Sequence, residues 1–245
     1  MRAFSKLTGA VPDADAIERY LTIDLGVAEQ HIRSLRDKDA TRSRVIQELQ
    51  AMAHDPRIEV GDPIVFYYAG HGSTVQSPHD WGNTDIQLIL PYDYSCEVDG
   101  VTVNGIPDRT IGALLAKLAE AKGNNITVVF DYCHSGSASC DDGLIPLRRA
   151  RGIPSSLPIP ADLDRDILSS SSSTHRMSDV LPGFLNQCLN SHVLLAACGM
   201  DELAWEEQGR GCFTRALLET LSSRGFDPRS LTYADLITRL PKLAG

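Results

Sequence analysis

The sequence predicts an α/β protein, a three-layer α/β/α domain whose central sheet is mostly parallel. Three observations predict this class. Three apolar runs, at 64–68, 126–130 and 192–198, lack polar alternation, as is typical of strands covered on both faces. Amphipathic helical patterns lie between these runs, so that strands and helices alternate. The length of 245 residues fits one such domain with a long insertion.

The N-terminal elements follow from apolar spacing and from start and stop signals. Apolar residues at helical spacing predict a helix over 12–25, and Pro12 and Asp13 suit its first turn. Further along, we expect a short strand at 31–35, a helix capped by Thr41 and ended by Asp55-Pro56, a polar, turn-rich loop at 73–85, and a small strand or hairpin arm at 86–90.

The second half contains a long segment of different composition. A helix is predicted from Asp108 to about Gly123, immediately before the apolar run at 126–130. Residues 135–190 then carry five prolines, five consecutive serines and three clustered arginines, Arg148, Arg149 and Arg151. This composition predicts a loop or processing linker outside the core. Helices are expected again at 211–223 and 233–240.

Composition excludes several classes of protein. The 23 Lys and Arg residues against 32 Asp and Glu residues leave a net charge of −9, which disfavours nucleic acid and anionic membranes as partners. No signal peptide opens the sequence, and no apolar run approaches the ~20 residues that span a bilayer. The six cysteines include no Cys-x-x-Cys pair, which argues against structural zinc. We therefore expect a cytoplasmic protein with reduced thiols.

Two short strings follow the first two predicted strands and carry reactive side chains. They are Tyr67-Tyr68-Ala69-Gly70-His71-Gly72 and Asp131-Tyr132-Cys133-His134-Ser135-Gly136. In an open parallel sheet, ligands bind outside the carboxyl ends of the strands. His71 and Cys133 should therefore emerge side by side at one edge. Because a cysteine is a strong nucleophile as a thiolate, and an imidazole is its usual activator, the pair predicts a cysteine hydrolase.

The other histidines and cysteines have simpler interpretations. Most cysteines near buried strands pack as small hydrophobic residues, and Cys198 is interpreted in this way. Cys133 differs because Ser-Gly-Ser follows His134, rather than more apolar sequence. His134 adjoins the nucleophile but points to the opposite face of the strand, so that we expect a structural role. Asp131 shares the parity of Cys133 and should face the same side.

These motifs resemble those of the metacaspases, the caspase-like proteases of fungi, plants and protists. The strings that carry the resemblance are Gly9–Ala14, Tyr68–Gly72, Asp131–Gly136, Leu194–Cys198 and Gly211–Leu217. They occur in the family's order and cover almost the whole sequence. The resemblance implies a caspase-like three-layer fold and a cysteine endopeptidase that acts on protein or peptide substrates as a monomer.

The resemblance also implies roles for individual residues. Cys133 would be the nucleophile, and His71 would keep its thiolate available and protonate the leaving amine. The backbone N–H groups of Gly72 and Cys133 would form the oxyanion hole. Metacaspases cleave after Arg or Lys, and the matching pocket acids here are Asp131 and Asp13. A simpler interpretation of Asp13 remains open, as an acid favoured by the dipole at a helix N-terminus.

The family divides into two catalytic parts joined by a linker. Here residues 1–140 resemble the large part, 141–190 the linker or processing loop, and 191–245 the small part. Together they form a single predicted domain. The family's apolar strand before Gly9 and its final strand near the C-terminus have no counterpart, so we expect a chain trimmed at both ends.

Two properties of the family remain open in this sequence. Many metacaspases need calcium, for which Asp80, Asp85, Asp93, Asp141 and Asp142 are sparse candidates, so no metal ligand is assigned and calcium stays open as an activator. The arginines between Arg148 and Arg151 are either a solvated charge patch or a self-cleavage site of a zymogen.

Two other functions can be compared with the protease on the same residues. A catalytically inert caspase-like scaffold could act as a regulatory or protein-binding module, an interpretation that rests on the missing strands. An α/β-hydrolase esterase is disfavoured, because Gly70-His71-Gly72 only faintly matches its oxyanion loop and no Gly-x-Ser-x-Gly motif is present.

Overall fold

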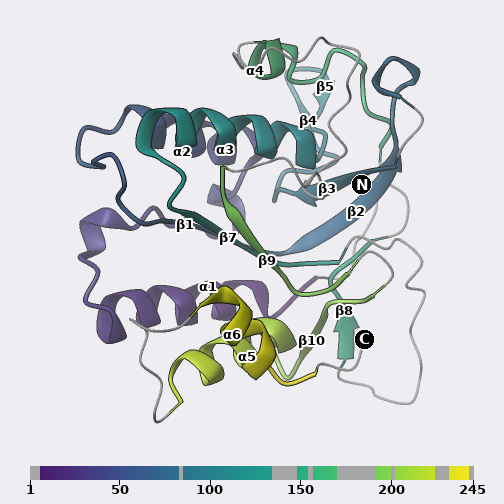
Figure 1. Ribbon diagram of the computed structural model, residues 1–245. Helices are drawn as coiled ribbons and strands as arrows, with labels where there is room; N and C mark the ends of the chain where they lie inside the picture. The colour runs from purple at the N-terminus through teal and green to yellow at the C-terminus, as the bar shows by residue number, and fades with distance from the viewer. Residues whose placement is uncertain are drawn as a thin grey trace.

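A parallel three-stranded sheet lies at the centre of the computed structural model (Figure 1). The structure describes residues 6–82, 85–133, 148–153, 157–169, 191–199, 202–223 and 232–242. Within these ranges the sheet comprises β1 (Ile64–Ala69), β7 (Ile126–Asp131) and β9 (Val193–Ala196), in the order β1-β7-β9. The three apolar runs predicted as strands are therefore confirmed.

Helices cover both faces of this sheet, which confirms the three-layer α/β/α architecture. α2 (Arg42–His54) and α3 (Asp108–Lys122) lie on one face, and α1 (Ala10–Arg19), α5 (Cys212–Leu221) and α6 (Tyr233–Arg239) lie on the other. α1 continues into a π-helical turn over Tyr20–Asp24. The Thr41 side chain accepts a hydrogen bond from the Arg44 N–H at the start of α2, as the sequence predicts.

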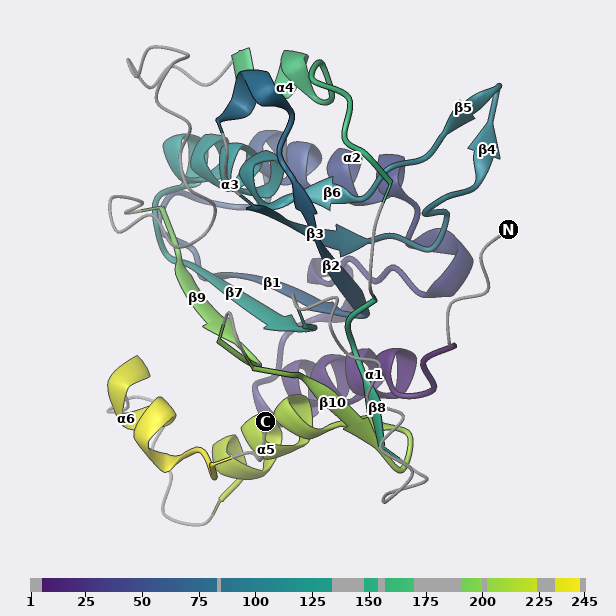
Figure 2. The same ribbon diagram turned by 90° about the vertical axis from the view of Figure 1, so that its right-hand side faces the viewer.

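Smaller sheets flank the central one (Figure 2). β2 (His71–Gln76), β3 (Asp85–Leu90) and β6 (Ile106–Pro107) form an antiparallel sheet, and β4 (Glu97–Val98) pairs with β5 (Val101–Thr102). β8 (Arg148–Ala150), β10 (Trp205–Glu207) and β11 (Arg210–Gly211) form another antiparallel sheet. The remaining described elements are α4 (Arg165–Ser169) and 3-10 turns at Glu29–His31, Asp37–Asp39 and His79–Trp81.

The larger apolar core lies between the central sheet and the α2–α3 layer. Its buried side chains come from both helices and from the strand beneath them: Ile46 and Leu49 of α2, Ile111, Leu114, Leu115 and Leu118 of α3, and Val128, Phe130 and Tyr132. A smaller core on the opposite face contains Val129, Leu195, Phe213, Leu217 and Leu236. Burial of these side chains supplies most of the free energy that holds the layers together.

The structure corrects three of the expected elements. Residues 31–35 form no strand, since no neighbouring strand pairs with them within the described residues. Residues 73–76 of the loop expected at 73–85 belong instead to β2, which pairs with β3 from His71↔Leu90 to Gln76↔Asp85. β1 is also less covered than expected, because it is an outer strand of the described sheet and Val65 is 46% exposed.

Part of the expected linker belongs to the packed structure. Ile153 and Ile159 are buried in an apolar cluster with Trp81, Ile86 and Leu88, and Ile167 of α4 reaches the larger core. Asp164 receives two hydrogen bonds from Arg42 at 2.8 and 2.6 Å. The prediction of a linker outside the core is therefore wrong for these residues, while 141–147, 154–156 and 170–190 lie outside the described residues.

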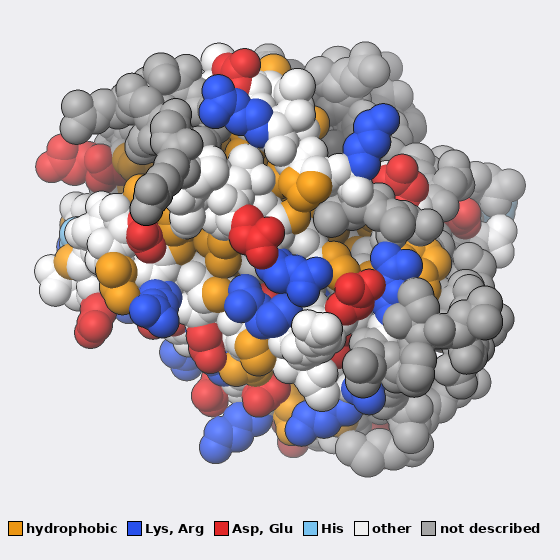
Figure 3. All heavy atoms as spheres, turned by 90° about the horizontal axis from the view of Figure 1, so that it is seen from below, with side chains coloured by type: hydrophobic (Ala, Val, Ile, Leu, Met, Phe, Trp, Pro, Cys, Tyr) orange, Lys and Arg blue, Asp and Glu red, His pale blue; other side chains and the backbone are white. Residues whose placement is uncertain are grey.

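The described helices are all too short or too polar to cross a membrane. The underside of the molecule, over the layer of α1, α5 and α6, carries acidic and basic side chains interspersed with apolar ones (Figure 3). Neither sign of charge gathers there over a wide area.

Candidate active site

The parallel register of β1 and β7 brings the two sequence motifs to one edge of the sheet. Ala69 pairs with Asp131 at the last position of the ladder, and the Gly70 N–H donates to the Asp131 carbonyl at 3.5 Å. The chain then continues to His71 from one strand and to Cys133 from the other. Both predicted catalytic residues therefore leave the sheet at neighbouring points of its carboxyl edge.

Neighbouring hydrogen bonds hold the backbone at His71. The Tyr68 hydroxyl donates to the His71 carbonyl at 2.7 Å and accepts from the Leu90 N–H at 3.2 Å. His71 also begins β2, where it pairs with Leu90. The histidine is thus carried by two strands and not by a free loop.

Gly72 and Cys133 approach each other too closely for any side chain at position 72. A Cβ there would lie 2.6 Å from the Cys133 carbonyl oxygen and would overlap the Tyr132 ring. Only glycine permits this contact. The close approach aims both backbone N–H groups at the same neighbouring atom.

That neighbouring atom is the carbonyl oxygen of Arg151. It accepts from the Gly72 N–H at 2.9 Å and from the Cys133 N–H at 3.3 Å. The Arg151 N–H donates to the Ala204 carbonyl at 2.9 Å, and the Ile153 N–H donates to the Gly72 carbonyl at 3.0 Å. Residues 151–153 therefore lie between β2 and the segment before β10, with the 151–152 peptide bond beside the backbone of Cys133.

The Arg151 side chain fills an acidic pocket. Its Nη2 lies 2.5 Å from Asp13 Oδ2, its Nη1 lies 3.0 Å from Asp131 Oδ2, and Glu206 Oε2 is 3.6 Å from Nη2. The side chains of Arg151, Asp13 and Asp131 are 0% exposed, and that of Glu206 is 2% exposed. Burying such charges is favourable only when they are paired in this way.

Each acid reaches the pocket from a different element. Asp13 lies in the first turn of α1, Asp131 ends β7, and Glu206 is on β10. Thr214 of α5 donates to Asp131 Oδ2 from its N–H at 3.1 Å and from its hydroxyl at 2.6 Å. These contacts orient the Asp131 carboxylate before any ligand arrives.

The remaining two acids are also held by neighbouring groups. Arg210 Nε and the Gly211 N–H donate to Asp13 at 2.6 and 2.7 Å. Glu206 accepts from the Thr8 and Gly9 N–H groups at 2.9 and 3.0 Å. Three carboxylates thus face two guanidinium groups, which leaves the pocket one negative charge in excess.

The pKa values in the pocket follow from burial and from this pairing. Burial by itself would lower the pKa of Arg151, but Asp131 and Asp13 raise it above its ordinary value, so the side chain stays cationic. Burial raises the pKa of Asp131, and the charge of Arg151 opposes that rise. A cation in the pocket therefore stabilises the ionised carboxylate.

Cys133 itself is fully buried. Its Sγ lies 3.3 Å from the Glu202 carbonyl oxygen, and it packs with Cys198 and Ala204. Tyr132 lies in the core on the opposite face, while Asp131 faces the α5 side with the thiol. The packing of Cys198 agrees with its expected role as a core residue, whereas His134 lies outside the described residues.

The structure adds residues that the motifs do not reveal. Glu206, Arg210 and Thr214 join the two predicted acids, and Arg151 occupies the space between them. The interpretation of the basic cluster as a solvated patch is wrong for Arg151, although Arg149 is exposed. An acidic pair, Glu206-Glu207, is visible in the sequence, but only the strand register shows which of them points inward.

The described residues contain no group of three or more side chains that could hold a metal ion. Asp93 accepts from the Arg42 N–H at 2.8 Å, and Asp80 lies in an exposed turn. Asp141 and Asp142 fall outside the described residues. The three described candidates, Asp80, Asp85 and Asp93, thus do not gather into such a group, and calcium activation stays a prediction.

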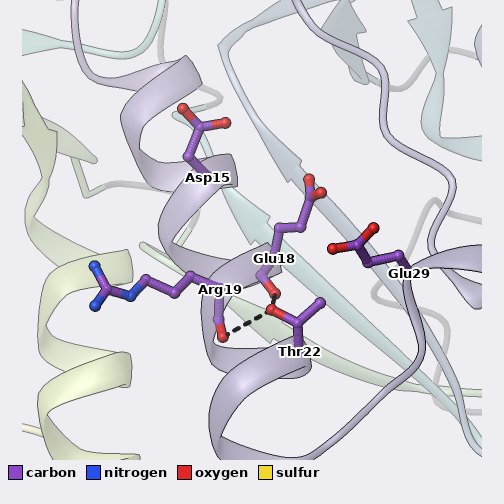
Figure 4. Close-up of a pocket in the computed structure, with 5 residues that line it drawn as sticks. All are labelled: Asp15, Glu18, Arg19, Thr22 and Glu29. Carbon is purple, nitrogen blue, oxygen red and sulfur yellow. Dashed lines mark hydrogen bonds between the residues drawn. The ribbon is translucent and has the colours of Figure 1, made fainter.

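A separate hollow on the surface of α1 is lined by Asp15, Glu18, Arg19, Thr22 and Glu29 (Figure 4). Arg36 bridges Asp15 and Glu18 at 3.0 and 2.8 Å. Two of the three acids that line this hollow are therefore already paired with an arginine, and none of the predicted catalytic residues lines it.

Comparison with known proteins identifies the class of this site. The sequence profile of the Caspase domain matches residues 2–242, and the chain belongs to that family. Similar curated proteins are metacaspases, as the motifs predict. Metacaspase-1 of Candida albicans is 28% identical over 145 residues, 54% of this chain and 30% of that protein. Metacaspase-7 of Arabidopsis thaliana is 31% identical over 140 residues, 54% of this chain and 31% of that protein.

The similarity covers only part of these relatives. Metacaspase-5 of Trypanosoma cruzi is 36% identical over 97 residues, which are 40% of this chain and 20% of that protein. The chain thus spans less than a third of the length of each of these three metacaspases. A crystal structure of a Geobacter sulfurreducens protein matches 96% of this chain and 81% of its own, with a TM-score of 0.62 and 22% identity, which supports the fold.

Proposed function

We propose that the protein is a cysteine endopeptidase that hydrolyses the peptide bond after an arginine or lysine. One observation carries the proposal. The Arg151 carbonyl oxygen accepts from the N–H groups of Gly72 and Cys133, while its guanidinium lies among Asp13, Asp131 and Glu206. A substrate residue needs both contacts at once, one for the reacting carbonyl and one for the side chain.

In the proposed reaction, the Cys133 thiol first gives its proton to the His71 imidazole. The thiolate attacks the substrate carbonyl carbon, and the carbonyl electron pair moves onto the oxygen. The two N–H groups stabilise this oxyanion, and loss of one such donor typically costs about 3 kcal/mol in the barrier. The carbon–nitrogen bond then breaks, His71 protonates the leaving amine, and a thioester remains on Cys133. Water, deprotonated by His71, hydrolyses the thioester and restores the thiol.

The pocket favours arginine over lysine in this proposal. Two different nitrogens of the Arg151 guanidinium approach two different carboxylates, at 2.5 and 3.0 Å. A planar guanidinium can make both contacts together, whereas an ammonium group is a single compact charge. We therefore expect lysine substrates to be cleaved more slowly than arginine substrates.

The same geometry supports self-processing of a zymogen at the Arg151–Gly152 bond. Arg151 already lies in the acidic pocket, and its carbonyl contacts the two N–H groups. Intramolecular positioning of this kind lowers the barrier to a first cleavage. The site lies within the predicted linker and at the end of its basic cluster.

The inert scaffold remains the second candidate, and a specific observation favours it. Arg151 fills the pocket, and Cys133 is fully buried beneath it. A chain in which Arg151 stays in the pocket permanently would have no catalytic activity and could act only by binding partners. Self-cleavage and thiol reactivity separate the two candidates.

The proposal is tested on the full chain with a fluorogenic peptide that ends in arginine, with and without calcium. Wild-type protein should release the fluorophore and yield fragments that end at Arg151 and begin at Gly152. Cys133→Ala should lower both rates by a thousandfold or more, and Cys96→Ala should leave them unchanged.

Two results would contradict the protease. Turnover retained by Cys133→Ala would remove the thiol from the mechanism. An intact, inactive wild-type chain in which the cysteines react equally slowly with iodoacetamide would favour the scaffold.

A further inference from the structure

The segment before Arg151 is bound as a strand. β8 pairs antiparallel with β10, with Trp205 opposite Ala150, Glu206 opposite Arg149 and Glu207 opposite Arg148 (Figure 2). If Arg151 stands for the substrate residue at the cleaved bond, Arg148 stands for the fourth residue counting back from that bond. This inference rests on the proposed protease function.

Alternation along β10 directs its side chains to two different sites. Glu206 points to the Arg151 pocket, whereas its neighbours Trp205 and Glu207 share the other face of the strand. Arg148 lies on this second face, because paired residues of an antiparallel ladder project to the same side. One short strand therefore contributes to two separate positions along a bound peptide.

Arg148 makes two favourable contacts on that face. Its Nε lies 2.9 Å from Glu207 Oε1, and its guanidinium carbon lies 4.6 Å from the centre of the Trp205 ring. The Arg148 side chain is 20% exposed, and Trp205 is buried, with 9% of its surface exposed. A cation held between an aromatic face and a carboxylate is a recognisable site for arginine, whose planar group stacks on the ring while it pairs with the acid.

The two residues between Arg148 and Arg151 make fewer specific contacts with the described residues. Arg149 is exposed, and its guanidinium donates to the Lys6 carbonyl oxygen at 2.7 Å. Ala150 presents a methyl group opposite Trp205. We propose that Trp205 and Glu207 form a second arginine subsite, so that the enzyme prefers substrates with the pattern Arg-x-x-Arg, cut after the second arginine.

The second subsite should contribute less than the first. The Glu207 side chain is 33% exposed and also lies 3.9 Å from Arg215, so its pair with Arg148 is screened and shared. An arginine at the fourth position should therefore raise kcat/KM by about tenfold, which corresponds to about 1.4 kcal/mol. The acidic pocket, which is fully buried, should show a larger effect.

The experiment compares two peptides that differ at one position. Full-length protein is assayed with fluorogenic Arg-Arg-Ala-Arg and Ala-Arg-Ala-Arg, and the ratio of their kcat/KM values is measured. The expected ratio is about ten. It should fall to about two or three in Glu207→Gln and in Trp205→Phe, because each variant weakens one of the two contacts.

Glu219→Gln is the matched control, since Glu219 is an exposed acid near the C-terminal end of α5, and it should keep the wild-type ratio. Equal cleavage of the two peptides would overturn the subsite while leaving the proposed protease standing. The same ratio in Glu207→Gln, Trp205→Phe and wild type would also overturn it. Cleavage of neither peptide by the wild-type protein would overturn both the subsite and the protease.

Discussion

The two faces of β7 carry side chains of opposite character. Val128, Phe130 and Tyr132 project into the apolar core under α2 and α3. Val129, Asp131 and Cys133 project to the other side, where apolar packing gives way to a charged pocket and a thiol at the end of the strand. A single strand can thus stabilise the fold with one face and position reactive groups with the other, because successive side chains alternate.

Each face also buries a carboxylate, and the two carboxylates have different surroundings. Asp131 pairs with Arg151 at 3.0 Å and accepts two hydrogen bonds from Thr214. Asp108, at the start of α3, is 6% exposed and accepts from the Arg109 N–H at 2.7 Å, and burial raises its pKa to about 6. Burial disfavours the charge of both carboxylates, but at Asp131 the buried Arg151 guanidinium and Thr214 oppose that effect.

The largest expected effect on stability is on the apolar face. Phe130 is 2% exposed and meets the rings of Phe66 and Tyr132 edge-on, with centroids 5.9 and 5.3 Å away. Phe130→Ala should lower the free energy of unfolding by about 3–5 kcal/mol, measured by urea denaturation. Phe130→Leu should lower it less. Both variants should keep the wild-type ratio of kcat/KM for arginine peptides to kcat/KM for leucine peptides. A changed ratio would show that the two faces are not independent.

The largest expected effect on selectivity is on the charged face. Asp131→Asn should lower kcat/KM for arginine peptides by about a hundredfold or more, because one partner of a buried ion pair is lost. Leucine peptides should be affected much less. Asp15→Asn, an exposed acid on α1 with a 63% exposed side chain, is the control. Equal losses for arginine and leucine peptides would contradict an acidic specificity pocket.

A smaller effect should follow from pH. The raised pKa of Asp108 means that the folded state holds its proton more tightly than the unfolded chain does. The contribution of this group to the free energy of unfolding is fully present below about pH 4. It is lost as the pH rises through about 6, and the total loss is about 3 kcal/mol.

Asp108→Asn should remove that dependence. The difference in unfolding free energy between wild type and variant, measured from pH 4 to pH 7.5, should change in favour of the variant as pH rises. A difference that stays constant over this range would show that Asp108 titrates normally in the folded protein.

Much of the site could be predicted because its residues lie next to strong local signals. His71 and Cys133 directly follow apolar strands, and parallel pairing brings such ends together. The resemblance to the metacaspases points to Gly72, and the close approach of its backbone to Cys133 fits that assignment. Asp131 followed from its parity with Cys133, and the structure puts both on the face towards α5 and β10.

Other elements could not be predicted, since they depend on partners far away in the chain. Ser73 is fully buried in β2 and donates to the Ile153 carbonyl at 3.1 Å, although its sequence context is that of a polar loop. Residues 31–35 have the sequence pattern of a strand but no neighbour to pair with among the described residues. Whether Glu206 or Glu207 points to the pocket is decided by the register of β10 against β8.

The sequence by itself determined which chemical groups are available: a thiol and an imidazole after buried strands, acids near them, and a basic cluster in a segment rich in proline and serine. Only the tertiary structure decided which arginine enters the acidic pocket and which acids surround it. The reason is physical, because strand and helix patterns are encoded over a few neighbouring residues. The burial of Arg151, in contrast, depends on acids from distant segments. Asp131 and Asp13 precede it by 20 and 138 residues, and Glu206 follows it by 55.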